Sequence, residues 1–106
     1  MGSQGSGDGQ LSYPVGVAVD SEGNILVANN NNHRIEVFGP QGNFIRNFGC
    51  KGSGDGQFNS PWGVAIDASG NIVVVDCFNH RIQIFQPDGK FMQTFGSKGS
   101  GDGQFT

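Results

Sequence analysis

A histidine followed by an arginine occurs twice in this sequence, each time within the tetrapeptide Asn-His-Arg-Ile. His33 and His80 are therefore the first candidates for chemistry, because imidazole serves both as a metal ligand and as a general base. A zinc site needs several Cys, His or carboxylate ligands at short recurring spacings, and neither histidine has a second His or Cys placed in this way. We expect both histidines to have structural roles.

The arginines that follow them, Arg34 and Arg81, are expected to hydrogen-bond carboxylate or backbone groups nearby. Asp76 is a suitable partner for Arg81. The two motifs lie 47 residues apart, and the residue equivalent to Asp76 is Asn29. The sequence therefore predicts an ion pair in the second copy and none in the first.

Two kinds of glycine-containing segment have a superficial likeness to ligand-binding loops. The segments 20–24 (DSEGN) and 67–71 (DASGN) lack the alternating oxygen ligands and the terminal acid of a calcium loop. The repeated GSGDG is not followed by a helix, which a phosphate loop requires. No Ser–His–Asp or Cys–His arrangement recurs. We predict turns here, and no catalytic residue, metal or cofactor.

Composition restricts the possible partners. The net charge is −3, and only six Lys and Arg residues are present, which argues against a phosphate backbone as ligand. No apolar run approaches the roughly 20 residues of a membrane helix, so we expect no membrane partner. Cys50 and Cys77 occupy non-equivalent positions and are expected to be free thiols, as in a reducing, cytoplasmic environment.

The element that must position all these residues is a tandem repeat. The hexapeptide GSGDGQ begins at residues 5, 52 and 99, a constant spacing of 47 residues. Aligning 5–51 with 52–98 gives 26 identical residues in 47 positions. A period of this length is the signature of a repeat architecture, which has to be recognised before individual residues are interpreted.

Each repeat contains four apolar or alternating segments separated by turn residues. In the second repeat they are 63–67, 71–75, 81–85 and 91–95, and in the first 16–20, 24–28, 34–38 and 43–48. The continuous β-branched run at 71–75 is typical of a strand buried on both faces, and 81–85 alternates as a half-buried strand does. Eight of the nine phenylalanines recur in both repeats, which indicates packing between neighbouring units. A four-stranded unit of this length is typical of one blade of a β-propeller.

These residues resemble the NHL repeat family. The similarity lies in the Pro-x-Gly-Val-Ala-x-Asp opening, the Gly-Asn turn, the Asn-His-Arg-Ile stretch, the Asp-Gly turn and the closing Phe-Gly. It is nearest in style to the C-terminal propellers of tripartite-motif (TRIM-NHL) proteins. The resemblance implies an all-β, six-bladed NHL β-propeller assembled from two four-stranded blades per chain. The boundaries we predict are an N-terminal connector at 1–12, blades at 13–51 and 52–98, and a duplicate connector at 99–106.

Two blades cannot close a ring, and a repeat cannot bury its apolar face alone. Head-to-tail association would close it, because heterologous contacts form a ring whenever the rotation permits. Three chains give six blades and four chains give eight, and the sequence does not choose between them. We expect a homotrimer in which one connector copy is docked at each junction and the other is displaced. A chain bounded by repeat limits is also what an excised or engineered piece of a longer propeller would look like.

The resemblance also places a ligand face where the connectors meet the loops between second and third strands. The residues expected there are Tyr13, Val15, Asn30, Asn31, Trp62, Cys77 and Phe78. Exposed aromatics can anchor a peptide or stack on single-stranded RNA. RNA-binding TRIM-NHL propellers often carry Arg where this chain has Val15 and Trp62, and Trp62 could instead pack between blades.

The function we predict is a non-catalytic, self-assembling interaction scaffold. The alternative is an RNA-binding or substrate-recognition module of a TRIM-NHL ubiquitin ligase-type protein. Some NHL-like propellers, such as the peptide-amidating lyases, are metal enzymes, but their ring-centre metal site cannot be assembled from these residues.

Overall fold

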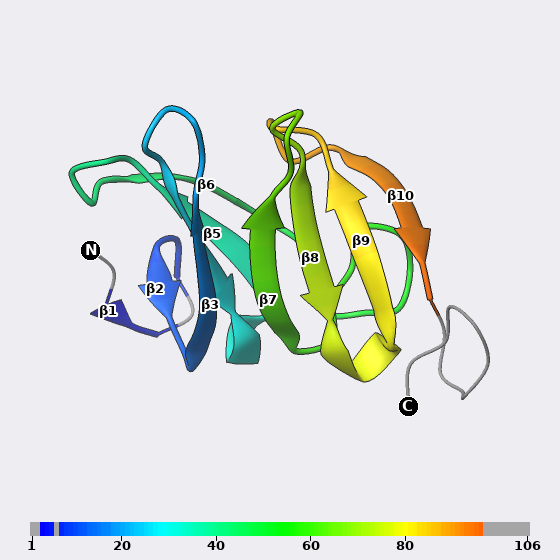
Figure 1. The fold of residues 1–106 in the computed structure, drawn as a ribbon. Helices are drawn as coiled ribbons and strands as arrows, with labels where there is room; N and C mark the ends of the chain where they lie inside the picture. Colours follow the sequence, from blue (N-terminus) through cyan, green and yellow to red (C-terminus); the bar gives the residue numbers. More distant parts are fainter. Residues whose placement is uncertain (1–2, 6, 97–106) are drawn as a thin grey trace.

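The structure is a computed structural model that describes residues 3–5 and 7–96. It contains two antiparallel sheets of four strands, and in each the strands are adjacent in chain order (Figure 1). Blade 1 consists of β3 (Pro14–Val19), β4 (Ile25–Asn29), β5 (Arg34–Phe38) and β6 (Phe44–Phe48). Blade 2 consists of β7 (Pro61–Ile66), β8 (Ile72–Asp76), β9 (Arg81–Phe85) and β10 (Phe91–Phe95). The prediction of an all-β chain with two four-stranded units is confirmed.

The first hairpin of each blade turns on an aspartate and a glycine. The Asp20 carboxylate accepts hydrogen bonds from the backbone N–H groups of Glu22 and Asn24, both at 2.9 Å. Gly23 supplies the positive φ of 83° that closes the turn. Asp67 accepts the equivalent bonds in blade 2. The prediction of turns at 20–24 and 67–71 is confirmed.

A short 3₁₀ turn joins the second strand to the third in both blades. These turns are η1 (Asn30–Asn32) and η2 (Cys77–Asn79), and each is followed by a histidine in the left-handed conformation, with φ 54°. His33 and His80 thereby reverse the chain into β5 and β9. No helix in the described part of the chain is long and apolar enough to cross a membrane.

The N-terminal segment folds as the connector between the blades does. Strands β1 (Ser3–Gln4) and β2 (Gln10–Leu11) pair in parallel. The connector between β6 and β7 makes the equivalent parallel bridge, from Lys51 to Phe58. The predicted C-terminal connector at 99–106 lies outside the described residues.

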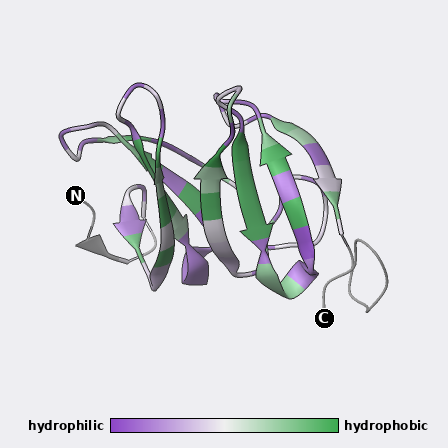
Figure 2. Ribbon diagram, viewed as in Figure 1, coloured by the Kyte–Doolittle hydropathy of each residue, from purple (hydrophilic) through white to green (hydrophobic). Residues whose placement is uncertain are grey.

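The core lies between the two blades. Leu26, Ala28, Ile35 and Val37 of blade 1 pack against Ile72, Val74 and Phe85 of blade 2. Figure 2 shows that hydrophobic residues are concentrated in the strands of the two sheets. The connector contributes Phe58, which is fully buried, and its ring lies 5.5 Å from that of Phe85 and 6.5 Å from that of Phe48. The repeated phenylalanines therefore do pack between blades where a neighbouring blade is present.

Candidate functional site

A buried polar network holds the connector onto blade 2. Arg81 pairs with Asp76, at 2.8 Å between Nε and Oδ2, and the Asp76 side chain is fully buried. The Arg81 guanidinium also donates to the backbone carbonyls of Ser53, Gly54 and Gln57 in the connector. Beside it, Gln83 accepts from the Gly56 N–H group. The predicted Asp76–Arg81 ion pair is confirmed.

Blade 1 has its own ion pair, so the prediction that this pair is absent was wrong. Arg34 pairs with Glu36, which lies two residues further along β5 and is fully buried. Glu36 also accepts from the Asn29 side chain at 2.9 Å and from the Gly9 N–H group at 3.1 Å. Asn29 and Glu36 face the same arginine from adjacent strands, so either position can carry the acid.

The two blades thus exchange the acid and the amide. Blade 1 has Asn29 and Glu36, whereas blade 2 has Asp76 and Gln83. Each pair offers one carboxylate to its arginine, acceptors for the connector N–H groups, and one amide that donates to a connector carbonyl. The sequence could have revealed Glu36 if positions 29 and 36 of the first repeat had been compared jointly with positions 76 and 83 of the second.

His33 links the two blades. Its Nδ1 accepts a hydrogen bond of 2.9 Å from the backbone N–H of Ser60, at the start of blade 2. Burial lowers the pKa of His33, Lys51 lowers it further, and Asp76 opposes the shift. The imidazole is therefore held neutral, as its acceptor role requires. Its contact is structural.

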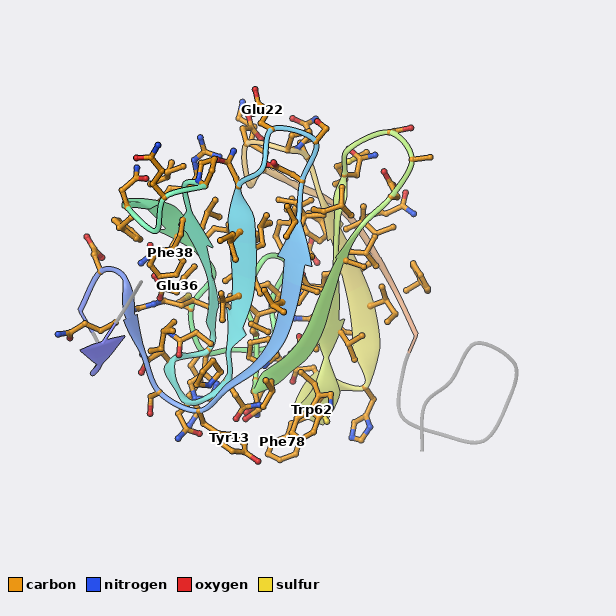
Figure 3. The ribbon with its side chains drawn as sticks, turned by 60° about the vertical axis from the view of Figure 1, so that its left-hand side comes forward. Tyr13, Glu22, Glu36, Phe38, Trp62 and Phe78 are labelled. Atoms are coloured by element: carbon orange, nitrogen blue, oxygen red, sulfur yellow. The ribbon has the colours of Figure 1, made fainter. Side chains whose placement is uncertain are left out.

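Three exposed aromatic side chains lie together at the end of the molecule where the connectors enter the blades. Tyr13 is 60% exposed, Trp62 51% and Phe78 63%. Figure 3 shows the three side by side, with Glu22 at the opposite end. They come from the two connectors' junctions with β3 and β7 and from η2. This aromatic end, defined by Tyr13, Trp62 and Phe78, is the candidate ligand face.

The other four predicted face residues lie differently. Val15 packs against the core, and Asn30 is buried, donating from Nδ2 to the Pro61 carbonyl across the blade interface. Cys77 is half-buried, and Asn31 is exposed. The aromatic end therefore depends on Tyr13, Trp62 and Phe78.

The opposite end of the blade interface holds an open cleft of about 280 Å³. Asp20, Glu22 and Arg46 line its rim, and Leu26 and Ile72 lie at its base. The Asp20 carboxylate is occupied by its turn. Within residues 3–5 and 7–96, no three His, Cys, Asp or Glu side chains gather closely enough to hold a metal ion.

Each blade also presents an end face that resembles half of the internal interface. In blade 2, Val64, Ile66 and Phe91 pack against the core. Their equivalents in blade 1, which define the blade 1 end face, are 65%, 61% and 37% exposed: Val17, Val19 and Phe44. The blade 1 end face is thus an interface without its partner.

The other side of blade 2 shows the complementary half. In blade 1, Leu26, Ala28, Ile35 and Val37 are at most 3% exposed because blade 2 covers them. Their equivalents in blade 2 are only half-buried, and the equivalent of Phe48 is 50% exposed. These residues define the blade 2 end face: Val73, Val75, Ile82, Ile84 and Phe95. The prediction of a both-side-buried strand at 71–75 therefore holds for one face only within a single chain.

Two meandering four-stranded sheets packed face to face through a connector phenylalanine define a class: consecutive blades of a β-propeller-type repeat protein. The sequence profile of the NHL repeat matches residues 11–38 and 58–85. The chain belongs to the NHL repeat family.

Curated relatives include TRIM-NHL proteins. The chain is 56% identical over 44 residues to the E3 ubiquitin-protein ligase TRIM71 of Rattus norvegicus, 47% over 45 residues to Protein lin-41 of Caenorhabditis elegans, and 45% over 49 residues to Protein brain tumor of Drosophila melanogaster. These alignments cover 42–46% of this chain and 4–5% of each relative.

A solved structure shares the fold. A protein of Bacteroides fragilis described as exported superposes with a TM-score of 0.71 over 87% of this chain and 26% of its own, at 19% identity. This match supports the blade architecture alone. The family and the fold together support a protein-interaction module.

Proposed function

We propose that this protein is a non-catalytic scaffold whose copies associate head to tail into a closed ring of blades. The observation that supports this most strongly is the pair of end faces. Eight apolar residues that are covered or partly covered at the internal interface have equivalents that are more exposed at one end of the chain, and these equivalents make up the two end faces. The blade 1 end face of one copy and the blade 2 end face of the next form the same interface that blades 1 and 2 form within the chain.

The docking of the N-terminal segment supports the proposal. The N-terminal segment is docked on blade 1 as the internal connector is on blade 2, through Gly9 and Glu36 in one case and Gly56 and Gln83 in the other. Figure 3 shows Glu36 and Phe38 beside this segment. We therefore place the N-terminal copy of the connector at each junction between chains.

Three copies would complete the six blades expected for an NHL propeller. Burying a Val, Ile or Phe side chain completely is worth about 1.5–3 kcal/mol, and each junction would cover eight such residues that are now partly exposed. Even partial burial of this set is a substantial driving force for association.

The assembled ring would present the aromatic ends of all its chains on one side. We propose that this side binds an apolar or aromatic segment of another protein. Arg34 and Arg81, which begin β5 and β9, are engaged by Glu36 and Asp76, and the chain is acidic overall. This charge distribution favours a peptide over RNA.

The mass in solution tests the ring. One chain is 11.2 kDa, so three copies give 33.6 kDa. We expect a single species of this mass by size-exclusion chromatography with light scattering, independent of concentration in the micromolar range. A stable 11.2 kDa species would overturn the proposal, and four copies would indicate eight blades.

A pair of lysine variants tests the interface. Val17→Lys places a charge on the blade 1 end face at a position that is exposed in the single chain, so the blades should fold but remain monomeric. Ala68→Lys adds the same charge in an exposed turn and should still assemble. Assembly of both variants alike would show that the end faces do not form the contact.

The ligand proposal can be tested with Trp62, the single tryptophan. We expect its fluorescence to change on titration with an aromatic-rich peptide and not with oligouridine at 150 mM salt. Binding of oligouridine that weakens steeply with salt would instead identify RNA as the ligand.

A further inference from the structure

The internal blade junction contains a hydrogen bond whose donor and acceptor both have equivalents elsewhere in the chain, one in each end blade. Within the chain, Ser60 donates its backbone N–H to His33 Nδ1 at 2.9 Å. Both residues have a positive φ, 58° and 54°, although neither is glycine. For an L-residue this conformation costs about 1–2 kcal/mol, so the geometry that aims these groups at each other is imposed by the fold.

Tyr13 is equivalent to Ser60, and His80 is equivalent to His33. Their φ angles, 56° and 54°, match those of the internal pair. Among the described residues, no hydrogen bond is formed by the Tyr13 N–H or by the His80 imidazole. One end of the chain therefore carries the donor, the other end carries the acceptor, and both already have the backbone conformation of the bonded pair.

We propose that His80 of one copy accepts a hydrogen bond through Nδ1 from the backbone N–H of Tyr13 of the next copy, and that this bond makes the junctions between chains sensitive to pH. The inference rests on the proposed ring, in which Tyr13 of one copy is placed relative to His80 of its neighbour as Ser60 is to His33. It assigns to the second Asn-His-Arg motif a role in recognising a second copy of this chain.

The pH dependence follows from the chemistry of the acceptor. Neutral imidazole with its proton on Nε2 offers a lone pair at Nδ1, whereas imidazolium carries N–H on both nitrogens and accepts nothing. Protonation would turn the contact into one between two donors. The bond therefore stabilises the junction where the imidazole is neutral and is lost where it is protonated, and an ordinary imidazole changes between these two forms near pH 6.5.

The position of the buried carboxylate differs between the two junctions. At the internal junction, Asp76 stabilises the charged form of His33, against burial and Lys51. At the outer junction the equivalent of Asp76 is the neutral Asn29, and the carboxylate of that network is Glu36, which is paired with Arg34. The equivalent of Lys51 is Lys98, which lies outside the described residues.

Other charged groups near the outer junction are paired. Arg81, which follows His80, is bound to Asp76, and on the neighbouring copy Arg34 is bound to Glu36. Among these described residues, His80 carries the imidazole, the side chain whose charge ordinarily changes between about pH 5 and 8.

The internal junction responds differently because the connector keeps its blades covalently together. Loss of the Ser60–His33 bond weakens a contact without separating its partners, whereas loss of the Tyr13–His80 bond leaves only non-covalent packing between chains. Acid should therefore release intact two-bladed chains from the ring.

The test is the mass of the protein by sedimentation or light scattering at pH 7.5 and 5.5, across a dilution series. We expect association to weaken by up to about tenfold per junction at pH 5.5, the cost of keeping an ordinary imidazole neutral one pH unit below 6.5. His80→Asn supplies an acceptor oxygen that does not titrate and tolerates the left-handed conformation, and it should assemble equally at both pH values. His33→Asn, the matched control, should keep the pH dependence.

Each outcome separates this inference from the ring itself. A ring with equal stability at both pH values, or one whose pH dependence persists in His80→Asn, would overturn the role of His80 and leave the proposed function standing. Absence of a ring at either pH would overturn the proposed function. Circular dichroism at pH 5.5 should show the blades folded, and unfolding there would contradict the release of intact chains.

Discussion

Replacing Glu36 with glutamine should destabilise blade 1 by about 3 kcal/mol. The substitution keeps the volume of the side chain and removes the carboxylate that neutralises Arg34, whose side chain is only 16% exposed. Breaking a buried pair from one side costs about 3–5 kcal/mol, because the other charge stays buried without compensation. The lower end applies here, since Arg34 also donates to the carbonyls of Gly7 and Gln10.

Blade 2 supplies the rescue. Combining Asn29→Asp with Glu36→Gln rebuilds in blade 1 the arrangement of Asp76 and Gln83, and should return the stability to within about 1 kcal/mol of the parent. Asn29→Asp alone should be destabilising at pH 7, because it places two buried carboxylates where an amide now donates to Glu36 over 2.9 Å.

The assay is equilibrium unfolding in urea at pH 7, followed by circular dichroism and extrapolated linearly to water. All variants would be made in the Val17→Lys background, so that association does not contribute to the free energy of unfolding. A loss below about 1 kcal/mol for Glu36→Gln, or a double variant no more stable than the single one, would refute the assignment of Glu36 as the functional equivalent of Asp76.

Two further changes test the packing between the blades. Gly49→Ala should destabilise the protein more than Gly70→Ala. Both residues have a positive φ, but a Cβ at Gly49 would lie 2.4 Å from the Phe58 ring, whereas a Cβ at Gly70 would have no neighbour closer than 3.8 Å. Unfolding in urea should show a difference of about 1–3 kcal/mol between the two variants, and equal losses of stability would contradict the prediction. Phe58→Ala should lower the free energy of unfolding by about 3–5 kcal/mol, because the Phe58 side chain is fully buried. Phe78→Ala, at an exposed position, should leave the thermal midpoint nearly unchanged. Comparable shifts in the two variants would show that the connector phenylalanine does not anchor the core.

The sequence was sufficient for the local architecture of this protein. The 47-residue period, the alternation at 81–85 and the Asp-Gly turns depend on residues close together in the chain, and the structure has strands and turns in those places. The prediction of the aromatic end rested on the family resemblance: Tyr13, Trp62 and Phe78 lie at one end of the molecule, as it implies, whereas Val15 and Asn30 from the same prediction are turned inward.

Only the tertiary structure decided which groups meet across strands and blades. Glu36 replaces Asp76 as the arginine's partner because two adjacent strands bring positions 29 and 36 to one guanidinium, a coincidence that alignment of single positions conceals. Likewise, the left-handed backbone at Tyr13 could be interpreted only from the internal junction, where its equivalent Ser60 donates to His33 Nδ1. Local pattern fixes the direction of each backbone segment, whereas partners distant in sequence are fixed by packing, which depends on all the strands at once.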